Sequence, residues 1–292
     1  MTQARKVTGT ALGTMALAAV ETNFPPGQSL TRDELAASVL PPSWSLLVHV
    51  TRVPWLREAI LRRLDRSHPG TWAGIACRKA YLDERLGAAL EADVGAVVSL
   101  GAGLDTRAHR LPGRERVPWL EVDLPENIAR KRAWIERRFG AVPSHVTLVA
   151  IDFDHDDLGR TLAAHGLPTD APIFFLWEGV TQYLQEAGVR ATLEALRFAP
   201  TGSLLAFSYV RRDFIDGTQT YGLDALRRRL VVQQHIWHFG LLVDEVDPFL
   251  RPYGWRVQEH LGSAELEARY VAPTGRAMTV MPIERLVLAE KI

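Results

Sequence analysis

The sequence predicts an α/β fold in which helices cover both faces of a parallel β-sheet. Short apolar runs begin near residue 95, and helical patterns separate them. Buried parallel strands have such continuous apolar runs, and strands that alternate with helices indicate a sheet covered on both faces. The 292 residues, 47% of them apolar, can bury a substantial core. We therefore expect one Rossmann-like α/β domain.

The first third of the chain is predicted to be helical. Pro54 stands at the first turn of a segment with apolar residues at helical spacing, and a second such segment spans 72–90. Thr31 with Glu34 three residues later matches a capping box, which predicts a short helix starting there. Threonine and glycine dilute the apolar run 7–20, so we expect an N-terminal helix rather than a secretion signal.

Seven strands can be identified in the rest of the chain. Five apolar runs predict strands at 96–100, 117–122, 146–151, 173–177 and 204–210, and two later strands are expected near 255–260 and 285–289. Helical patterns at 125–139 and 186–198 lie between them. This alternation predicts that the sheet is parallel.

The composition excludes several classes of protein. Lys and Arg total 34 and Asp and Glu total 34, whereas a nucleic-acid binder needs an excess of positive charge. Cys77 is the single cysteine, which rules out a disulfide scaffold. No stretch approaches the roughly 18 consecutive apolar residues of a membrane span. We expect a cytoplasmic protein without a nucleic-acid or membrane partner.

A glycine-containing turn follows the first predicted strand. Gly101 and Gly103 would let the backbone turn sharply and approach a ligand, although such a turn can also serve packing alone. Asp123 follows Gly103 by 20 residues, the spacing at which an acid meets ribose hydroxyls. The alternative is that Asp123 caps the helix beginning at Pro125. Thr106 replaces the third glycine of the dinucleotide fingerprint, which disfavours NAD.

Two further strand ends carry acidic residues. Asp152 and Phe153 could hold and stack an adenine, or they could belong to a solvated acidic loop with residues 154–157. That loop has no further ligands at metal-site spacing, so we predict no metal. Glu178 ends a strongly apolar strand, where a buried charge needs compensation. It either turns outward or lines the ligand cleft, where a sulfonium or amino group would suit it.

Other catalytic arrangements are not favoured. His235 and His238 could share a helix face, but structural histidines are the favoured interpretation. The chain contains no GxSxG motif, which removes the usual nucleophile elbow of an α/β-hydrolase. No catalytic side chain is therefore assigned from the sequence.

Taken together, these motifs resemble the leucine carboxyl methyltransferase-like class I methyltransferases, including a large actinobacterial group that depends on S-adenosylmethionine. The resemblance covers nearly the whole chain and is most specific at residues 97–107, 121–125 and 178–184. It implies a single domain with a seven-stranded Rossmann-like core over 95–292. It also implies a helical lid over 1–94 and an insertion around 211–247 that closes over the acceptor.

The resemblance further implies which residues bind S-adenosylmethionine. Arg78 would pair with its carboxylate, Gly101, Ala102 and Gly103 would lie beside the methionine moiety, Asp123 would bind the ribose, Asp152 and Phe153 would frame the adenine, and Glu178 would face the amino group. One position departs from the pattern, because Arg78-Lys79-Ala80 stands where the family often has Arg-Thr-Arg. Lys79 would point about 100° away on a helix, so it is not an obvious replacement.

The expected function is an O-methyltransferase acting on a small molecule such as a natural-product intermediate. Methyl transfer from a sulfonium requires mainly alignment of the reactants and exclusion of water. A carboxylate acceptor is ionised at neutral pH and needs no base, whereas a hydroxyl benefits from one. The lack of an evident base favours a carboxylate. Two alternatives remain: a cofactor-binding protein whose transferase activity is lost or repurposed, and an NAD-dependent oxidoreductase.

Overall fold

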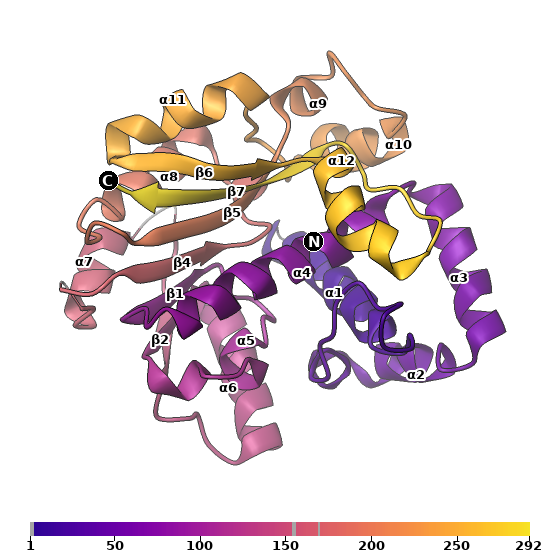
Figure 1. Ribbon diagram of the computed structural model, residues 1–292, viewed down its shortest axis with the longest axis horizontal. Helices are drawn as coiled ribbons and strands as arrows, with labels where there is room; N and C mark the ends of the chain where they lie inside the picture. Colours follow the sequence, from indigo (N-terminus) through magenta and orange to yellow (C-terminus); the bar gives the residue numbers. More distant parts are fainter. Residues whose placement is uncertain (1–2, 154–155, 169) are drawn as a thin grey trace.

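A central seven-stranded sheet with helices on both faces forms the core of the computed structural model, which describes residues 3–153, 156–168 and 170–292 (Figure 1). The strands are β1 (Ala96–Leu100), β2 (Trp119–Asp123), β3 (Val146–Ala150), β4 (Ile173–Trp177), β5 (Leu204–Val210), β6 (Trp255–Leu261) and β7 (Glu284–Lys291). Their order across the sheet is β3-β2-β1-β4-β5-β7-β6. All seven predicted strands are present.

The helices precede, connect and cover these strands. The α-helices are α1 (Gln3–Glu21), α2 (Pro42–Val50), α3 (Pro54–Ser67), α4 (Thr71–Glu91), α5 (Arg107–Arg110), α6 (Pro125–Phe139), α7 (Leu158–Ala164), α8 (Glu186–Ala195), α9 (Arg212–Asp216), α10 (Asp224–Arg227), α11 (Val246–Leu250) and α12 (Ser263–Leu266). Short 3-10 and π segments are η1 (Ala36–Val39), η2 (Arg114–Arg116), η3 (Thr181–Tyr183), η4 (Arg228–Gln233), η5 (Val243–Glu245), η6 (Arg251–Tyr253), η7 (Glu267–Val271) and η8 (Ala272–Thr274). Within the described ranges, no helix has both the length and the apolarity that crossing a bilayer requires.

The direction of the last strand differs from the prediction of a parallel sheet. β1 to β5 run parallel, but β7 lies between β5 and β6 and is antiparallel to both. Side chains alternate between the two faces of a strand whichever way its neighbour runs. The apolar pattern therefore predicts a buried strand without specifying its direction.

Several element boundaries also differ from the sequence prediction, most of all the start of β2 and the end of α8. β2 begins at Trp119 rather than at residue 117, because Pro118 has no N–H to donate to a sheet ladder. α8 ends at Ala195 rather than at residue 198. The chain turns there toward Pro200, which disfavours a helical conformation in the residue before it.

The capping box predicted at Thr31 is wrong. The helical segment nearby is the 3-10 turn η1, which starts at Ala36 without a side-chain cap, and the Thr31 hydroxyl is buried without a hydrogen-bond partner. Asp33 holds this stretch instead. Its Oδ1 accepts from the Leu35 N–H at 3.1 Å, and its Oδ2 accepts from the Thr106 hydroxyl at 2.7 Å. A long-range contact with the core thus overrides the local signal.

The helix expected to carry His235 and His238 is also absent. His235 has a φ of 49°, and the residues after η4 follow a non-helical path. The backbone N–H of His238 donates to the Gln182 carbonyl at 2.7 Å, a contact that fixes this path against the loop after β4. The two histidines therefore do not share a helix face.

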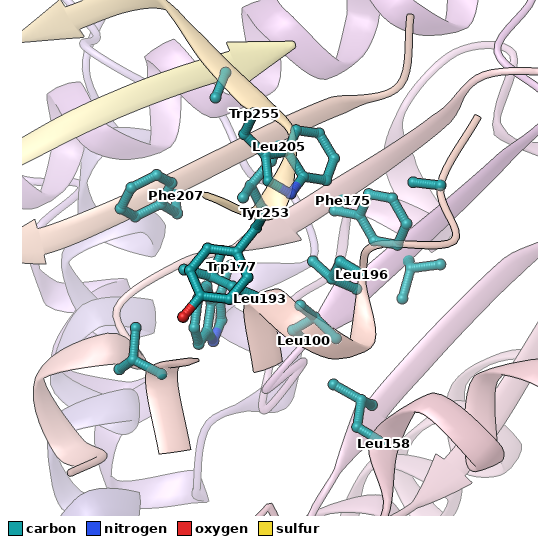
Figure 2. Packing of buried hydrophobic residues seen from close by; sticks show 14 of the residues in the cluster. Leu100, Leu158, Phe175, Trp177, Leu193, Leu196, Leu205, Phe207, Tyr253 and Trp255 are labelled. Atoms are coloured by element: carbon teal, nitrogen blue, oxygen red, sulfur yellow. The ribbon is translucent and has the colours of Figure 1, made fainter. Parts of the chain in front are cut away.

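Apolar side chains fill both faces of the sheet. Val98 belongs to a cluster packed against α7, α8 and α11, whereas the neighbouring Val97 belongs to a second cluster on the α4 side. Figure 2 shows the first cluster, in which Phe175 and Trp177 of β4 lie among side chains from β5, α8 and the segment before β6. Strands in the middle of the sheet are thus buried on both faces.

Candidate functional site

A cavity of about 1080 Å³ lies at the carboxyl ends of the central strands. Residues within three positions after β1, β3 and β4 line it, together with the last residue of β2. β1 lies between β2 and β4, so the strand order reverses at this point. Open α/β sheets bind ligands at such a switch point. The volume slightly exceeds the roughly 300–1,000 Å³ of ordinary small-molecule sites.

The structure brings together every cofactor-binding residue that the sequence predicted. All of them line this one cavity: Arg78, Gly101, Ala102, Gly103, Asp123, Asp152, Phe153 and Glu178. They come from α4 and from the ends of four strands, so only the folded chain places them together.

The turn after β1 is held tightly by β2. The N–H groups of Gly101 and Ala102 both donate to the Val122 carbonyl, at 2.8 and 3.0 Å. Gly101 and Gly103 have φ angles of 71° and 44°, in the region that favours glycine. A Cβ on Gly101 would lie 2.4 Å from Val180 Cγ2, whereas one on Gly103 would meet nothing closer than 3.8 Å. Gly101 therefore serves packing, and the backbone at Gly103 opens toward the cavity.

Asp123 has structural contacts on both carboxylate oxygens. Oδ2 accepts from the Gly103 N–H at 2.5 Å. Oδ1 accepts from the Leu124 N–H and from the Asn127 side chain, both at 2.7 Å. Asp123 thus holds the glycine turn and the start of α6, where Leu124 occupies the cap position itself. Each carboxylate oxygen has two lone pairs, so Oδ2 keeps capacity for another donor.

Glu178 lies among three cationic side chains. Its Oε1 accepts from Arg78 Nε at 2.9 Å, its Oε2 accepts from Arg107 Nη1 at 2.6 Å, and Lys79 Nζ lies 3.9 Å from Oε1. Burial alone would raise the pKa of Glu178, but these cations hold that pKa well below its usual range. The side chain is 12% exposed and lines the cavity. It is therefore an ionised carboxylate facing the ligand space.

Arg78 bridges two carboxylates. In addition to Glu178, its Nη1 donates to Glu284 Oε1 at 2.6 Å. Burial would lower the pKa of the guanidinium, but Glu284 and Glu178 raise it above its usual value. Glu284 lines the cavity and was missed by sequence reasoning, because it is a single acid at the start of the final strand with no motif around it.

Lys79, which did not look like an obvious replacement for the missing second arginine, does lie in the site. Lys79 is 3% exposed, lines the cavity and lies near the same Glu178 oxygen as Arg78. The 100° offset along α4 does not separate the two side chains, because this stretch of the helix is buried from residue 76 through residue 79. Long side chains on adjacent positions can then converge on one carboxylate.

Arg107 is the fully buried centre of this charge cluster. It donates to Asp83 at 2.6 Å, Asp105 at 2.7 Å and Glu178 at 2.6 Å. Burial would raise the pKa of Asp105, yet Arg107 and Lys79 lower it to about 2. The motif after the glycine turn contains both Asp105 and Arg107, so their nearness to the site could have been predicted. Their network of ion pairs could not have been predicted from the sequence.

Apolar side chains from the N-terminal helices and from residues 226–237 line the rest of the cavity. The set includes Leu17, Trp44, Leu47, Ile60, Leu64, Ile75, Leu226, Leu230 and Trp237. The hydroxyls of Thr10 and Tyr183 lie 2.8 Å apart, which joins α1 to the loop after β4 across this region. The cavity thus has one charged half and one apolar half.

No metal cluster of His, Cys, Asp or Glu occurs among the residues that the structure describes. Two members of the acidic loop considered as a metal site, Asp154 and His155, lie outside those residues. Asp156 contacts the backbone N–H of Asp152 at 2.8 Å, which closes the turn after β3.

Comparisons with known proteins agree with this geometry. The family model of the leucine carboxyl methyltransferases matches residues 11–197. A relative in Mycobacterium bovis, named as an inferred S-adenosyl-L-methionine-dependent methyltransferase, is 32% identical over 93% of this chain and 86% of its own. A similarly named protein of Mycobacterium avium is 37% identical over 47% of this chain and 46% of its own.

A solved structure shows the same fold. A DUF574 family protein of Streptomyces avermitilis aligns with a TM-score of 0.58 at 13% identity, over 94% of this chain and 97% of that one. The predicted class I methyltransferase sheet is confirmed by this likeness and by the observed strand order. Given the matched family model and the M. bovis relative, the chain belongs to the leucine carboxyl methyltransferase family.

Proposed function

We propose that this chain transfers the methyl group of S-adenosylmethionine to a carboxylate oxygen of a small, largely apolar molecule. The observation that carries the proposal is the single cavity in which a charged half adjoins an apolar half. The first half suits a zwitterionic, nucleoside-containing cofactor, and the second suits an apolar acceptor. The names of the mycobacterial relatives support the same cofactor.

The charged half fits S-adenosylmethionine group by group. Glu178 uses one lone pair of each oxygen on an arginine and keeps capacity for the ammonium group. Arg78 is the cation for the carboxylate, Asp123 Oδ2 can accept a ribose hydroxyl, and Phe153 offers a ring beside the adenine. When bound, the cofactor supplies a methyl group that is already activated by the sulfonium.

The alternatives explain the structure less well. Thr106 takes the place of the third dinucleotide glycine, and its hydroxyl anchors Asp33 of the N-terminal region at 2.7 Å. That position therefore connects two parts of the chain and does not make room for a pyrophosphate. Ala80 in place of the family's second arginine does not argue for lost activity, because Lys79 brings a cation from the same helix toward Glu178.

A carboxylate is preferred as the acceptor because the reaction then needs no base. His68 is the one histidine lining the cavity among the described residues, and it lies on the apolar side, just after α3. A hydroxyl acceptor would need such a group to remove its proton, whereas a carboxylate is ionised near neutral pH. Aligning the two reactants and excluding water are then the tasks of the protein.

The product should be a methyl ester. We expect enzyme incubated with methyl-labelled S-adenosylmethionine and an extract of small acids to form a product that releases volatile methanol in mild base. The rate should be flat between about pH 6.5 and 8.5. His68→Gln should leave it unchanged. Label that stays non-volatile, with a rate that rises with pH and falls in the His68 variant, would identify a hydroxyl acceptor and leave methyl transfer intact.

Gly103→Ala should weaken S-adenosylhomocysteine binding by at least tenfold. The new methyl group would point into open space at the cavity, where the cofactor backbone approaches, and the positive φ adds strain of about 1 kcal/mol. Gly140→Ala is the matched control, because Gly140 has a φ of 86°, no neighbour within 4 Å of its Cβ, and no place in the cavity. Calorimetry and thermal melts should show a similar loss of stability in both variants and a loss of affinity only in the first.

Gly101→Val is the less informative substitution. A side chain there would collide with Val180 inside the protein itself, so a loss of binding could follow from distortion of the turn. Equal ligand affinity in Gly103→Ala and the wild type would show that the turn does not contact the cofactor.

A further inference from the structure

The two consecutive helices α2 and α3 with their connecting loop, residues 42–67 and called the α2–α3 hairpin below, expose an unusual amount of apolar surface. α3 lies at the edge of the molecule away from the sheet (Figure 1). Eleven large apolar side chains are exposed in the described part of the chain, and six of them belong to this hairpin: Trp44, Leu46, Leu47, Val53, Trp55 and Leu64. Single exposed apolar residues are ordinary, whereas a local concentration of them marks an interaction surface.

The six side chains fall into two sets. Trp44, Leu47 and Leu64 line the cavity, so their exposure belongs to its mouth. Leu46, Val53 and Trp55 are 66%, 41% and 69% exposed and do not line the cavity. Val53 and Trp55 lie at the loop that joins the two helices, and Leu46 lies in the middle of α2. The second set is therefore an apolar tip that the proposed function does not use.

The charge around this tip is positive, although the whole chain has a net charge of zero. Residues 42–67 contain five arginines against Glu58 and Asp65. The exposed Arg52, Arg63 and Arg66 make no ion pair with any described residue. At 100° per residue, Arg62 and Arg66 fall on the same face of α3 as Trp55. The hairpin thus combines an exposed tryptophan and aliphatic side chains with unpaired cations.

We propose that the α2–α3 hairpin docks on an anionic lipid membrane. Segments that bind at a membrane interface combine tryptophan and aliphatic side chains with arginine, and each cation near an anionic surface contributes to binding. Trp55 and Leu46 would enter the headgroup region, while Arg52, Arg63 and Arg66 contact lipid phosphates. The sequence-based expectation of no membrane partner rested on the lack of a spanning segment. Peripheral docking does not require one.

Docking by this hairpin would hold the cavity wall near the lipid surface, although Leu64 lines the cavity from the face of α3 opposite Trp55. Trp44, Leu47 and Leu64 are both exposed and part of the cavity wall. This step rests on the proposed function. It assigns the acceptor to amphiphilic acids that partition into membranes. The apolar half of the cavity would then lie close to the source of the acceptor.

Flotation with lipid vesicles tests the docking without cofactor or acceptor. We expect the protein to bind vesicles of phosphatidylglycerol and phosphatidylcholine, and to bind pure phosphatidylcholine at least tenfold more weakly. Added salt should weaken binding. A variant with Arg52, Arg63 and Arg66 changed to Gln should lose on the order of a hundredfold in partitioning. Trp55→Ser combined with Leu46→Ser should lose roughly tenfold.

The matched controls are Ile292→Ser, at an exposed apolar residue far from the hairpin, and Arg256→Gln, at an exposed arginine of β6. Both should bind vesicles as the wild type does. Every variant should keep its melting temperature and its affinity for S-adenosylhomocysteine, because none of these side chains lines the cavity. A failure of the methyltransferase assignment would therefore leave the vesicle result untouched.

Three results would overturn the proposal. The wild type could fail to float with anionic vesicles, or the hairpin variants could float as well as the controls. Light scattering could also show a dimer that becomes a monomer in the Trp55 and Leu46 variant, which would identify the tip as a contact between two copies of the chain.

Discussion

Glu178→Gln is expected to lower the affinity for S-adenosylhomocysteine by about a hundredfold and to leave the affinity for 5′-methylthioadenosine nearly unchanged. The two ligands share the adenosine and the thioether, and only the first carries the amino-acid group. The substitution removes the negative charge that Arg78, Lys79 and Arg107 share, so an ammonium group would meet a cationic cluster with one carboxylate fewer. A hydrogen bond to a charged group accounts for roughly 1.5–3 kcal/mol of that loss.

The same substitution should also destabilise the fold, because it leaves buried arginines with one partner fewer. A loss of about 3 kcal/mol in the free energy of unfolding is expected. Glu21→Gln is the control, since Glu21 is a fully buried carboxylate that pairs with Arg276 at 2.8 Å and does not line the cavity. It should lose stability and keep its affinity for both ligands. If Glu178→Gln weakens the binding of both ligands equally, Glu178 does not recognise the amino group.

Asp123→Ala should instead weaken the binding of both ligands to the same degree, by about 1.5–3 kcal/mol, because both contain the ribose. It should also cost about 1–2 kcal/mol in the free energy of unfolding, since the carboxylate holds the Gly103 N–H and the start of α6. Calorimetry with each ligand and chemical denaturation without ligand separate these two effects.

Asp157→Ala provides the comparison for a purely structural aspartate. Asp157 caps α7 by accepting from the Arg160 N–H at 3.0 Å, and it lies outside the cavity. Its loss should cost about 1 kcal/mol of stability and no affinity. If Asp123→Ala also loses stability but no affinity, then Asp123 only stabilises the turn and the helix.

Much of this site follows from the sequence because strand ends are local features. Each of four apolar runs predicts a buried strand. Gly101, Asp123, Asp152 and Glu178 stand at the ends of these strands or just after them. The carboxyl ends of parallel strands share one edge, so a sequence that places polar residues there also predicts that they meet. All seven strands are present, and the predicted residues at the strand ends line one cavity, where Arg78 of α4, implied by the family resemblance, joins them.

The sequence did not predict contacts between residues that lie far apart in the chain. Glu284 is 206 residues from Arg78, and no pattern in the chain joins them. Lys79 appeared to point away because helical spacing gives a direction for Cβ but not the reach of a long side chain in a buried helix. Thr31 matched a local cap, yet Asp33 took over that stretch through its contact with Thr106.

The sequence by itself therefore determined the fold class, the strand ends and the side chains that could hold a nucleoside cofactor. Periodicity and turn chemistry act over a few residues, and the chain contains that information directly. Only the tertiary structure decided the direction of β7, the carboxylates that compensate Arg78 and Arg107, and the apolar half of the cavity. Those features depend on contacts between segments far apart in the chain, where burial and charge pairing outweigh local preference.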